Sequence, residues 1–205
     1  HPALMEIRKE VSLKIPTTEF DPSHIVMSST HTHSGPDVVG IWGPDQITSG
    51  VDTAYMKKLI HASSDAIVSA WENRKAAKAV YAETQFGEEW VYNISDSLNI
   101  DRSLTVLQFL DQEGGSIATL TNFACHPTIL DGASSEVSAD FASSMYKYLD
   151  NTLGGVNFYL QGAIGGWIQP EYESKTFESV DKRGRELGQA IETALQNPTG
   201  LDSMA

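Results

Sequence analysis

Apolar residues recur at helical spacing in four stretches of the chain. The predicted helices cover residues 4–15, 51–73, the stretch that follows Asp140, and 175–197. Pro16 ends the first of them, because proline lacks the N–H group that a continuing helix needs. Asp52 stands at the start of the second, where a side chain that accepts hydrogen bonds from free backbone N–H groups is favoured. These signals set the limits of the first two helices.

Short apolar runs between the helices predict five strands. They cover residues 24–29, 78–86, 105–111, 116–124 and 156–160. A glycine-containing turn separates the third strand from the fourth, so we expect a hairpin with Gly114 and Gly115 at its tip. Helices and strands alternate, but the hairpin adds antiparallel pairing. The pattern therefore predicts a mixed α/β domain.

Residues 30–50 follow neither period and are rich in glycine, proline and aspartate. The segment nevertheless carries the apolar residues Val38, Val39, Ile41 and Trp42. Long loops with apolar side chains inside a compact domain often serve a function. We therefore expect a functional segment here.

The composition narrows the classes of protein to which the chain can belong. With 205 residues it is long enough for one domain with a substantial core. Its net charge of -13 disfavours a nucleic-acid partner, because phosphate backbones are repelled. The apolar runs are far shorter than the roughly 20 residues that cross a bilayer, so no transmembrane segment is expected. The single cysteine, Cys125, excludes an internal disulfide.

The first residues contain neither an initiator methionine nor a signal-like segment. The chain also opens close to the first predicted helix. We therefore expect that residue 1 is not the natural start and that any targeting signal lies upstream.

The stretch MSSTHTHSGPD places His31 and His33 one residue apart, directly after an apolar run. In an extended segment, residues two apart point to the same side, so both imidazoles can reach one point. Neutral imidazole is the commonest nitrogen ligand of zinc. Gly35 and Pro36 then turn the chain. The pattern indicates half of a metal site, with a pair of polar loop residues as the alternative.

A further histidine, His126, follows a predicted strand in the stretch NFACHPTIL. Ligands tend to bind at strand ends in α/β sheets, so two strand ends that each deliver histidine favour a metal site. The alternative is a core histidine bonded to a backbone carbonyl. Cys125 would point to the opposite face of the strand and is expected in the core. The other histidines carry little weight as functional residues: His1, His24 and His61.

Arg102 stands at the entrance of a predicted strand, where a guanidinium can fork onto a carboxylate or a carbonyl oxygen. A surface ion pair with Asp101 or Asp96 is the alternative. Asp140 precedes the third predicted helix. We expect it to cap that helix rather than to accept a hydrogen bond from a ligand histidine.

The glycine-bearing stretch 161–170 follows a strand, but it lacks both the glycine pattern and the Lys-Ser or Lys-Thr pair of nucleotide-binding loops. Its glycines are expected to let the backbone pass close to a bound group. A glycosylation match at Asn93 is of the kind that arises by chance.

Four stretches, THTHSGPD, NFACHPTIL, SADFASSM and FYLQGAIGGW, occur in an order that resembles the neutral (non-lysosomal) ceramidase family. The resemblance extends from about Met27 to Trp167. Members are amide hydrolases that cleave N-acylsphingosine with a zinc ion. Their catalytic domain has mixed β-sheets packed together and flanked by helices, which agrees with the α/β prediction. The resemblance implies that residues 1–205 are a single, partial N-terminal catalytic domain, truncated at both ends.

The resemblance also implies roles for individual residues. His31 and His126 correspond to zinc ligands. His33 would lie beside the zinc and position water or the substrate amide. Arg102 is similar to an arginine near the substrate. The remaining ligands of the family, a glutamate and a tyrosine, are expected beyond Ala205.

The family carries a serine implicated in catalysis in a loop that reads QGAIGG in this chain, with Gly162 at the serine position. Gly162 has no hydroxyl group, so it can neither act as a nucleophile nor orient water. We therefore expect the chain to keep the histidines that correspond to zinc ligands and to lack the catalytic serine.

These patterns lead to three functional hypotheses. The first is a zinc-dependent, ceramidase-like hydrolase of an amide or acyl bond, acting on N-acylsphingosine or a related lipid amide. The second is a metal-dependent phosphoesterase, because zinc sites of this type serve either chemistry. The third is a non-catalytic family member that binds a lipid or a glycan, as Gly162 suggests. The resemblance further implies contact with a membrane surface and a secreted, cell-surface or periplasmic location.

Overall fold

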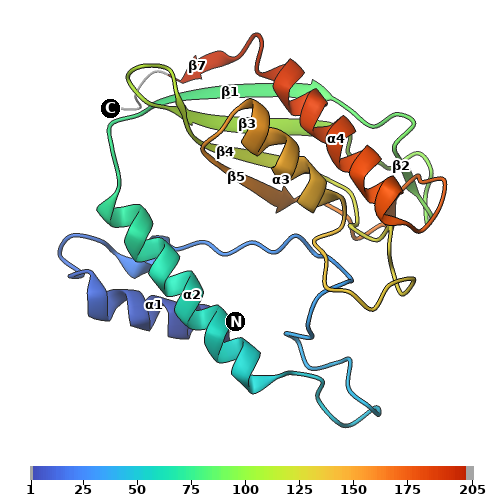
Figure 1. The fold of residues 1–205 in the computed structure, drawn as a ribbon, viewed down its shortest axis with the longest axis horizontal. Helices are drawn as coiled ribbons and strands as arrows, with labels where there is room; N and C mark the ends of the chain where they lie inside the picture. The colour runs from blue at the N-terminus through green and yellow to red at the C-terminus, as the bar shows by residue number, and fades with distance from the viewer. Residues whose placement is uncertain (1, 202–205) are drawn as a thin grey trace. The chain divides into compact units, whose positions relative to one another are not determined.

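The computed structural model describes residues 2–201, which form two compact units. Residues 2–27 and 36–75 make up the first unit, and residues 28–35 and 76–201 make up the second. The first contains α1 (Pro2–Lys14), a short 3-10 helix η1 (Pro22–His24) and α2 (Thr53–Glu72). The second contains β1 (Lys78–Gln85), β2 (Val91–Asn93), β3 (Ser103–Leu110), β4 (Ser116–Phe123), α3 (Phe141–Thr152), β5 (Val156–Gln161), β6 (Ile168–Pro170), α4 (Phe177–Ala194) and β7 (Thr199–Leu201), as Figure 1 shows.

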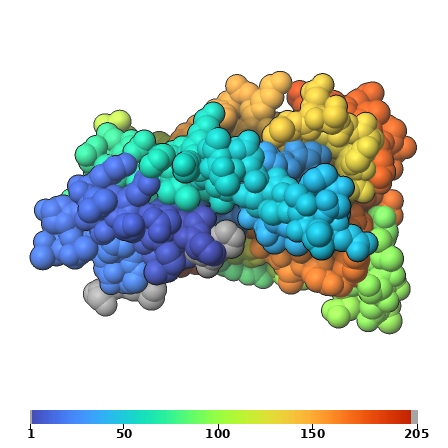
Figure 2. All heavy atoms as spheres, turned by 90° about the horizontal axis from the view of Figure 1, so that it is seen from below, coloured from blue at the N-terminus to red at the C-terminus, as the bar shows by residue number. Residues whose placement is uncertain are grey.

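The first unit is a pair of helices packed along their apolar faces. In Figure 2, the blue atoms of α1 and the blue-green atoms of α2 lie next to each other. Ile7 and Val11 of α1 are fully buried in this contact. The carboxylate of Asp52 accepts hydrogen bonds from the N–H groups of Ala54 and Tyr55 at 2.8 and 3.1 Å. Both predicted helices and the predicted cap are confirmed.

The predicted strand at residues 24–29 is wrong. The chain is irregular there, and Val26 is 87% exposed although Ile25 is buried. The Nη2 group of Arg8 donates hydrogen bonds to the carbonyl oxygens of Ser23 and Ile25, each at 2.9 Å. A short apolar run becomes a strand where a neighbouring strand supplies a hydrogen-bond ladder, and here an arginine side chain satisfies the carbonyls instead.

The second unit is built on a five-stranded sheet with the order β5-β4-β3-β1-β7. β4 and β5 are parallel, and the other neighbouring strands are antiparallel. α3 and α4 cover one face of this sheet (Figure 1), and β2 pairs with β6 in a separate two-stranded sheet. The predicted mixed α/β fold and the β3–β4 hairpin are confirmed. The pattern missed β2, β6 and β7, which are too short to show a period.

Two glycines let α4 approach α3 closely. A Cβ atom at Gly184 would lie 2.4 Å from the carbonyl oxygen of Phe141, and one at Gly188 would lie 2.5 Å from the ring of Tyr148. Any larger residue at either position would push the helices apart. This close packing holds the start of α3, and with it the loop 124–140 that joins β4 to α3.

No helix among residues 2–201 is long and apolar enough to cross a membrane.

Candidate metal centre

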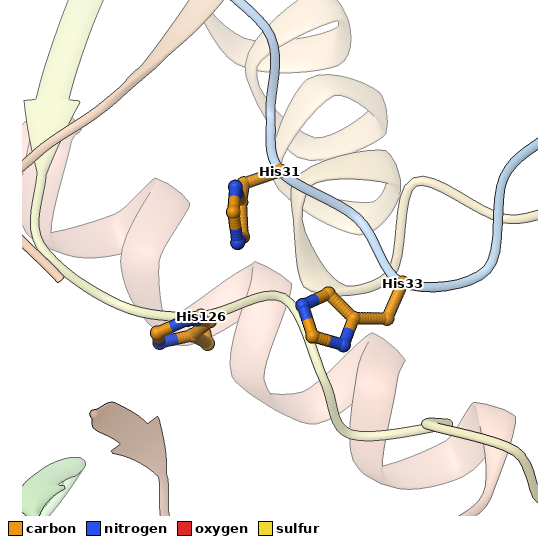
Figure 3. Close-up of side chains that lie close together, drawn as sticks. All are labelled: His31, His33 and His126. Atoms are coloured by element: carbon orange, nitrogen blue, oxygen red, sulfur yellow. The ribbon is translucent and has the colours of Figure 1, made fainter. Parts of the chain in front are cut away.

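Three histidine side chains from two segments point into one space in the second unit (Figure 3). His31 and His33 lie on the segment 28–35, and His126 lies just after β4. Three distances separate the ring centroids: 5.3 Å for His31 and His33, 5.1 Å for His31 and His126, and 5.8 Å for His33 and His126. One nitrogen of each ring lies within 4.8 Å of the others. The structure thus brings together all three histidines that the sequence singled out.

His126 is the most firmly held of the three. It is 8% exposed, and its Nδ1 lies 2.7 Å from the carbonyl oxygen of Ile168. Its backbone N–H donates to the same oxygen at 3.0 Å. Because a carbonyl only accepts, Nδ1 carries the proton and Nε2 keeps its lone pair for a metal. The carbonyl bond that the sequence offered as an alternative role therefore orients this ring as a ligand.

The pKa values of His31 and His126 are both lowered. For His31, desolvation is the largest cause, followed by the nearby charges of His126 and His33. For His126, desolvation lowers the pKa more than the hydrogen bond to Ile168 raises it, and His33 adds to the lowering. Neutral imidazole is the form that binds metal, so both shifts favour ligation.

The segment that carries His31 and His33 does not end a strand, contrary to expectation. His31 has a φ of 66°, a left-handed conformation that costs a residue with a Cβ about 1–2 kcal/mol. Two hydrogen bonds hold the segment to the loop before α3. Thr32 Oγ1 donates to the carbonyl of Ser138 at 2.7 Å, and the N–H of Ser138 donates to the carbonyl of Ser34 at 2.9 Å. A tethered turn, and not strand alternation, thus places the two rings together.

Asp131 lies beside His33. Its Oδ1 is 3.7 Å from His33 Nδ1, and its Oδ2 is 3.5 Å from Lys175 Nζ. All three side chains are partly exposed, so these contacts contribute little to stability. A carboxylate at this position favours the tautomer with the proton on Nδ1, which leaves Nε2 of His33 as an acceptor.

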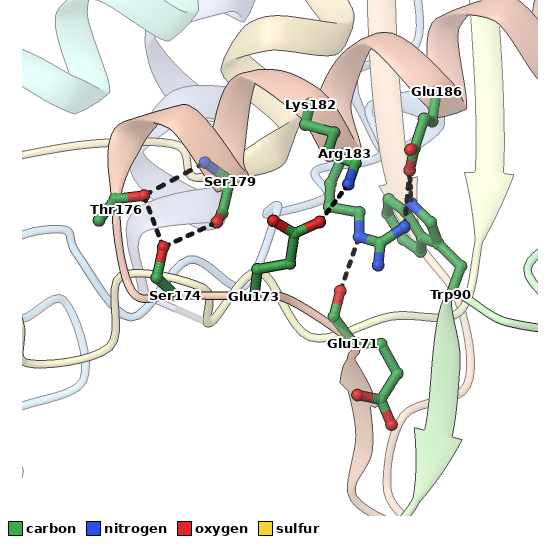
Figure 4. A network of polar contacts seen from close by, with 9 residues as sticks. All are labelled: Trp90, Glu171, Glu173, Ser174, Thr176, Ser179, Lys182, Arg183 and Glu186. Atoms are coloured by element: carbon green, nitrogen blue, oxygen red, sulfur yellow. Dashed lines mark hydrogen bonds and ion pairs between the residues drawn. The ribbon is translucent and has the colours of Figure 1, made fainter.

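A polar network fixes the chain that follows β6 to α4 (Figure 4). Arg183 donates from Nε to the carbonyl of Glu171 at 2.6 Å and from Nη1 to Glu186 at 2.7 Å. Trp90 Nε1 donates to the same carboxylate at 2.9 Å, and the N–H of Glu171 donates to the Trp90 carbonyl at 2.8 Å. The network anchors the β2–β6 sheet, so the carbonyl of Ile168 stays beneath His126.

A hollow of about 150 Å³ opens beside the histidines. Its lining consists of His31, His126, Ile164, Gly165 and Trp167. The indole of Trp167 lies nearly parallel to the imidazole of His126, with an interplanar angle of 21° and ring centroids 6.2 Å apart. The hollow therefore joins two imidazoles to two large apolar side chains.

Gly162 has no room for a side chain. A Cβ atom there would lie 2.9 Å from the backbone nitrogen of Ala124 and 2.9 Å from the carbonyl carbon of Phe123. The N–H of Gly162 donates to the Phe123 carbonyl at 2.9 Å, which holds the two segments together. The expected close backbone approach in this loop is to a neighbouring segment of the chain. The glycine at position 162 is thus required by packing.

Arg102 bonds to backbone carbonyl oxygens, one of the two kinds of partner that its place at a strand entrance predicted, and the alternative ion pair with Asp101 or Asp96 is not formed. Its guanidinium donates to the carbonyls of Gly87 and Val91, the latter at 3.4 Å. Asp101 instead accepts a hydrogen bond from the N–H of Ser103 at 2.9 Å. Arg102 does not line the hollow beside the histidines, and its contact with a substrate stays a prediction.

Asp140 caps α3, as expected. Its two carboxylate oxygens accept hydrogen bonds from the N–H groups of Phe141 at 2.8 Å and Leu130 at 3.0 Å. Burial raises the pKa of Asp140, although these bonds counteract the shift. The carboxylate thereby joins the loop after His126 to the helix. Cys125 is fully buried, which confirms its place in the core.

The remaining residues that the sequence raised have ordinary roles. Asn93 is 7% exposed, and its side chain donates to the Asn99 carbonyl at 2.7 Å, so the glycosylation match is fortuitous. His61 is exposed and pairs with Glu10 in the first unit. His24 lies in η1, and His1 is outside the described residues.

Three contributors to the site escaped sequence reasoning: the carbonyl of Ile168, the carboxylate of Asp131 and the indole of Trp167. A backbone carbonyl leaves no sequence signal. Asp131 is one of many acidic residues in a chain with a net charge of -13. Trp167 had a usable signal, because a large aromatic residue inside a glycine-bearing loop is unlike its neighbours.

No family model matches the chain. The chain is 28% identical to neutral ceramidase B of Dictyostelium discoideum over 148 aligned residues. The aligned region covers 62% of this chain and 20% of that protein. It is also 27% identical to neutral ceramidase A of the same organism over 150 aligned residues, which make up 63% of this chain and 21% of that protein. The chain thus spans about a fifth of the curated relatives that it matches.

Solved structures share its fold. The neutral ceramidase from Pseudomonas aeruginosa matches with a TM-score of 0.76 at 15% identity, over 93% of this chain and 34% of that one. A structure described as ceramidase complexed with C2 matches with a TM-score of 0.71 at 16% identity over the same shares. The sequence matches and the shared fold together support the neutral ceramidase family for this chain.

Proposed function

We propose that the chain contributes the histidine part of the metal centre in a ceramidase-like hydrolase. The observation that carries this proposal is the convergence of His31, His33 and His126, whose nitrogens lie within 4.8 Å of one another. The substrate class is a lipid amide such as N-acylsphingosine. The names of the relatives support this class, and the whole reaction is proposed for a protein of which this chain is a part.

The donor set fits zinc. Imidazole nitrogens bind zinc at about 2.0–2.1 Å, so two ligands of one ion lie at most about 4.2 Å apart. The nitrogens here lie within 4.8 Å, and small rotations of the exposed rings close the difference. When bound, zinc supplies a Lewis acid and lowers the pKa of water to about 7.

The chain's own residues hold protons at defined atoms. We assign His31 and His126 as ligands, with Nε2 of His126 facing the metal because the Ile168 carbonyl holds the proton on Nδ1. His33 is assigned to a hydrogen bond that its Nε2 accepts from the attacking water or from the amide N–H of the substrate. Asp131, 3.7 Å from Nδ1, keeps His33 in the matching tautomer.

Water, and not a side chain at position 162, is the nucleophile in this proposal. The carbonyl carbon gains the hydroxyl group of water, the carbon–nitrogen bond breaks, and the amine leaves with the proton. Gly162 supports this assignment, since a serine there would meet the backbone of Phe123 and Ala124 at 2.9 Å.

The zinc content of single variants distinguishes the two proposed ligands, His31 and His126, from His33, which is proposed not to bind the metal. We expect one zinc per chain in the full-length protein, and loss of zinc in His31→Ala and His126→Ala. His33→Ala should keep zinc and lose hydrolysis of amides, because its assigned contact is with water or substrate. His61→Ala is the matched control, an exposed histidine in the other unit. Stoichiometric zinc in both ligand variants would contradict the assignment, and loss of zinc in His33→Ala would make His33 a third ligand.

A second candidate is a family member that binds a lipid amide without cleaving it. The single observation in its favour is the absence of space for a serine at Gly162. Turnover of amides, esters and phosphoesters by the zinc-loaded protein distinguishes the two. Binding of a lipid amide with no turnover of any of them would support the second candidate.

A further inference from the structure

Trp167 combines two features that a packing role does not explain. It is 58% exposed, and its φ is 62°. A left-handed backbone is unfavourable for a bulky residue and persists where the surroundings impose it. Here the turn is held on both sides, because the N–H of Trp167 donates to the Ile164 carbonyl at 2.9 Å and its carbonyl accepts from Ile94 at 3.2 Å. The strained turn therefore holds an aromatic side chain largely in solvent.

The same turn sets the indole beside the histidine cluster. Trp167 precedes Ile168, whose carbonyl holds both the backbone and Nδ1 of His126, so the two rings are connected through one short rigid segment. The rings lie 6.2 Å apart and nearly parallel. A Cβ atom at Gly165 would meet no atom within 4 Å, so this part of the loop does not fill the hollow. The side chains of Trp167 and Ile164 therefore form the apolar wall of the hollow.

We propose that Trp167 and Ile164 bind the aliphatic chain of the substrate, next to the bond that is hydrolysed. Trp167 is then a specificity-determining residue of the hollow. The role of Trp167 in substrate specificity rests on the proposed function. The binding of an aliphatic chain by Trp167 and Ile164 can be measured separately, without turnover.

The chemistry of the lining favours an aliphatic group. Apart from the two imidazoles and the single indole N–H of Trp167, the residues around the hollow offer no polar side-chain group, and none of them carries a carboxylate, an ammonium or a guanidinium. Its volume of about 150 Å³ is below the roughly 300 Å³ at the lower end of whole-ligand sites. The hollow therefore fits a segment of a chain rather than a complete lipid.

The test is a series of straight-chain hydroxamates from two to eight carbons, whose head group binds zinc while the tail varies. Their dissociation constants are measured by calorimetry on the zinc-loaded full-length protein. In the wild type we expect affinity to rise about fourfold for each early methylene group that reaches the wall. In Trp167→Ala the rise should fall below about twofold per methylene group, while the two-carbon compound binds as in the wild type.

Two further variants test the cause. Trp167→Phe keeps an aromatic face and should retain most of the dependence on chain length. Trp42→Ala removes another exposed tryptophan, 76% exposed, from the first unit and should leave the dependence unchanged. An undiminished dependence in Trp167→Ala, with the variant folded by circular dichroism, would overturn the proposal.

Failure of the proposed function gives a different result. If the wild type binds no zinc and no two-carbon hydroxamate, the metal centre is wrong. The wall is then tested on the metal-free protein with straight-chain primary amides. Affinity that rises with chain length in the wild type and not in Trp167→Ala supports the wall, and equal behaviour of the two proteins refutes it.

Discussion

The two halves of the histidine cluster are built differently. His126 is 8% exposed and is held twice by one carbonyl oxygen, at the end of a strand that lies inside a sheet. His31 and His33 are exposed and lie on an irregular segment with a left-handed residue. One half is thus preorganised by the core, and the other by a few hydrogen bonds to a neighbouring loop.

This difference has a consequence for metal binding. A site is most exact where its ligands stand on rigid elements with supporting hydrogen bonds. His126 meets this condition, and His31 and His33 can adjust their rings within a tethered turn. We expect the buried half to set the position of a metal and the exposed half to close on it.

The largest expected effect comes from breaking the rigid half at Gly162. Gly162→Ser places a side chain 2.9 Å from the backbone of Phe123 and Ala124, three residues or fewer before His126. We expect the free energy of unfolding to fall by about 1–3 kcal/mol, as overpacking does elsewhere, with no gain of amidase activity. Urea unfolding measures the loss.

Gly165→Ser is the matched control, because a Cβ atom at Gly165 would meet nothing within 4 Å. It should stay within about 0.5 kcal/mol of the wild type. Unchanged stability in Gly162→Ser together with new activity would mean that the loop accepts a serine after all.

A smaller effect, on zinc affinity, should follow when the segment that carries His31 and His33 is held less firmly. Thr32→Val removes the hydroxyl that donates to the Ser138 carbonyl at 2.7 Å, and so frees the turn between His31 and His33. Zinc affinity should drop about tenfold, as for other groups that orient ligands, while the free energy of unfolding changes by about 1 kcal/mol. Competition with a zinc chelator measures the first quantity, and urea unfolding measures the second.

Thr48→Val removes a comparable hydroxyl bond in the first unit, from Thr48 Oγ1 to Asp45 at 2.9 Å. It should leave zinc affinity unchanged. Equal zinc affinity in Thr32→Val and the wild type would show that the tether does not orient the ligands.

The smallest expected effect is on the pH dependence of stability in the metal-free protein. His31 and His126 face each other and His33, and their pKa values in the folded protein are below the ordinary value. The unfolded chain therefore binds protons first as the pH falls through about 6.5, so stability is highest above this pH and declines below it. Urea midpoints at about pH 7.5 and about pH 5.5 span the unfolded pKa.

Glutamine variants of His31 and His126 should each reduce the decline, because a residue that does not titrate is removed from the cluster. The comparison with the wild type cancels the contributions of other groups. A decline that is the same in all three proteins would mean that neither imidazole is desolvated.

Much of the fold could be predicted because its signals are local. The apolar spacing of α1 to α4, the carboxylates at Asp52 and Asp140, and the glycines of the β3–β4 turn each act within a few residues. The prediction failed at residues 24–29, where the distant Arg8 side chain satisfies the carbonyls that a strand would have paired. It also missed strands of three residues, whose pairing depends on partners far along the chain.

The sequence by itself determined which residue types were available for the site, because histidine is scarce and its spacing in THTHSGPD and NFACHPTIL is visible without a fold. Only the tertiary structure decided how they meet. The contact between segment 28–35 and loop 124–140 spans 106 residues between Thr32 and Ser138, and the orientation of His126 depends on a carbonyl 42 residues away. Hydrogen bonds and packing between such distant segments depend on the whole fold, and for this reason no local pattern encodes them.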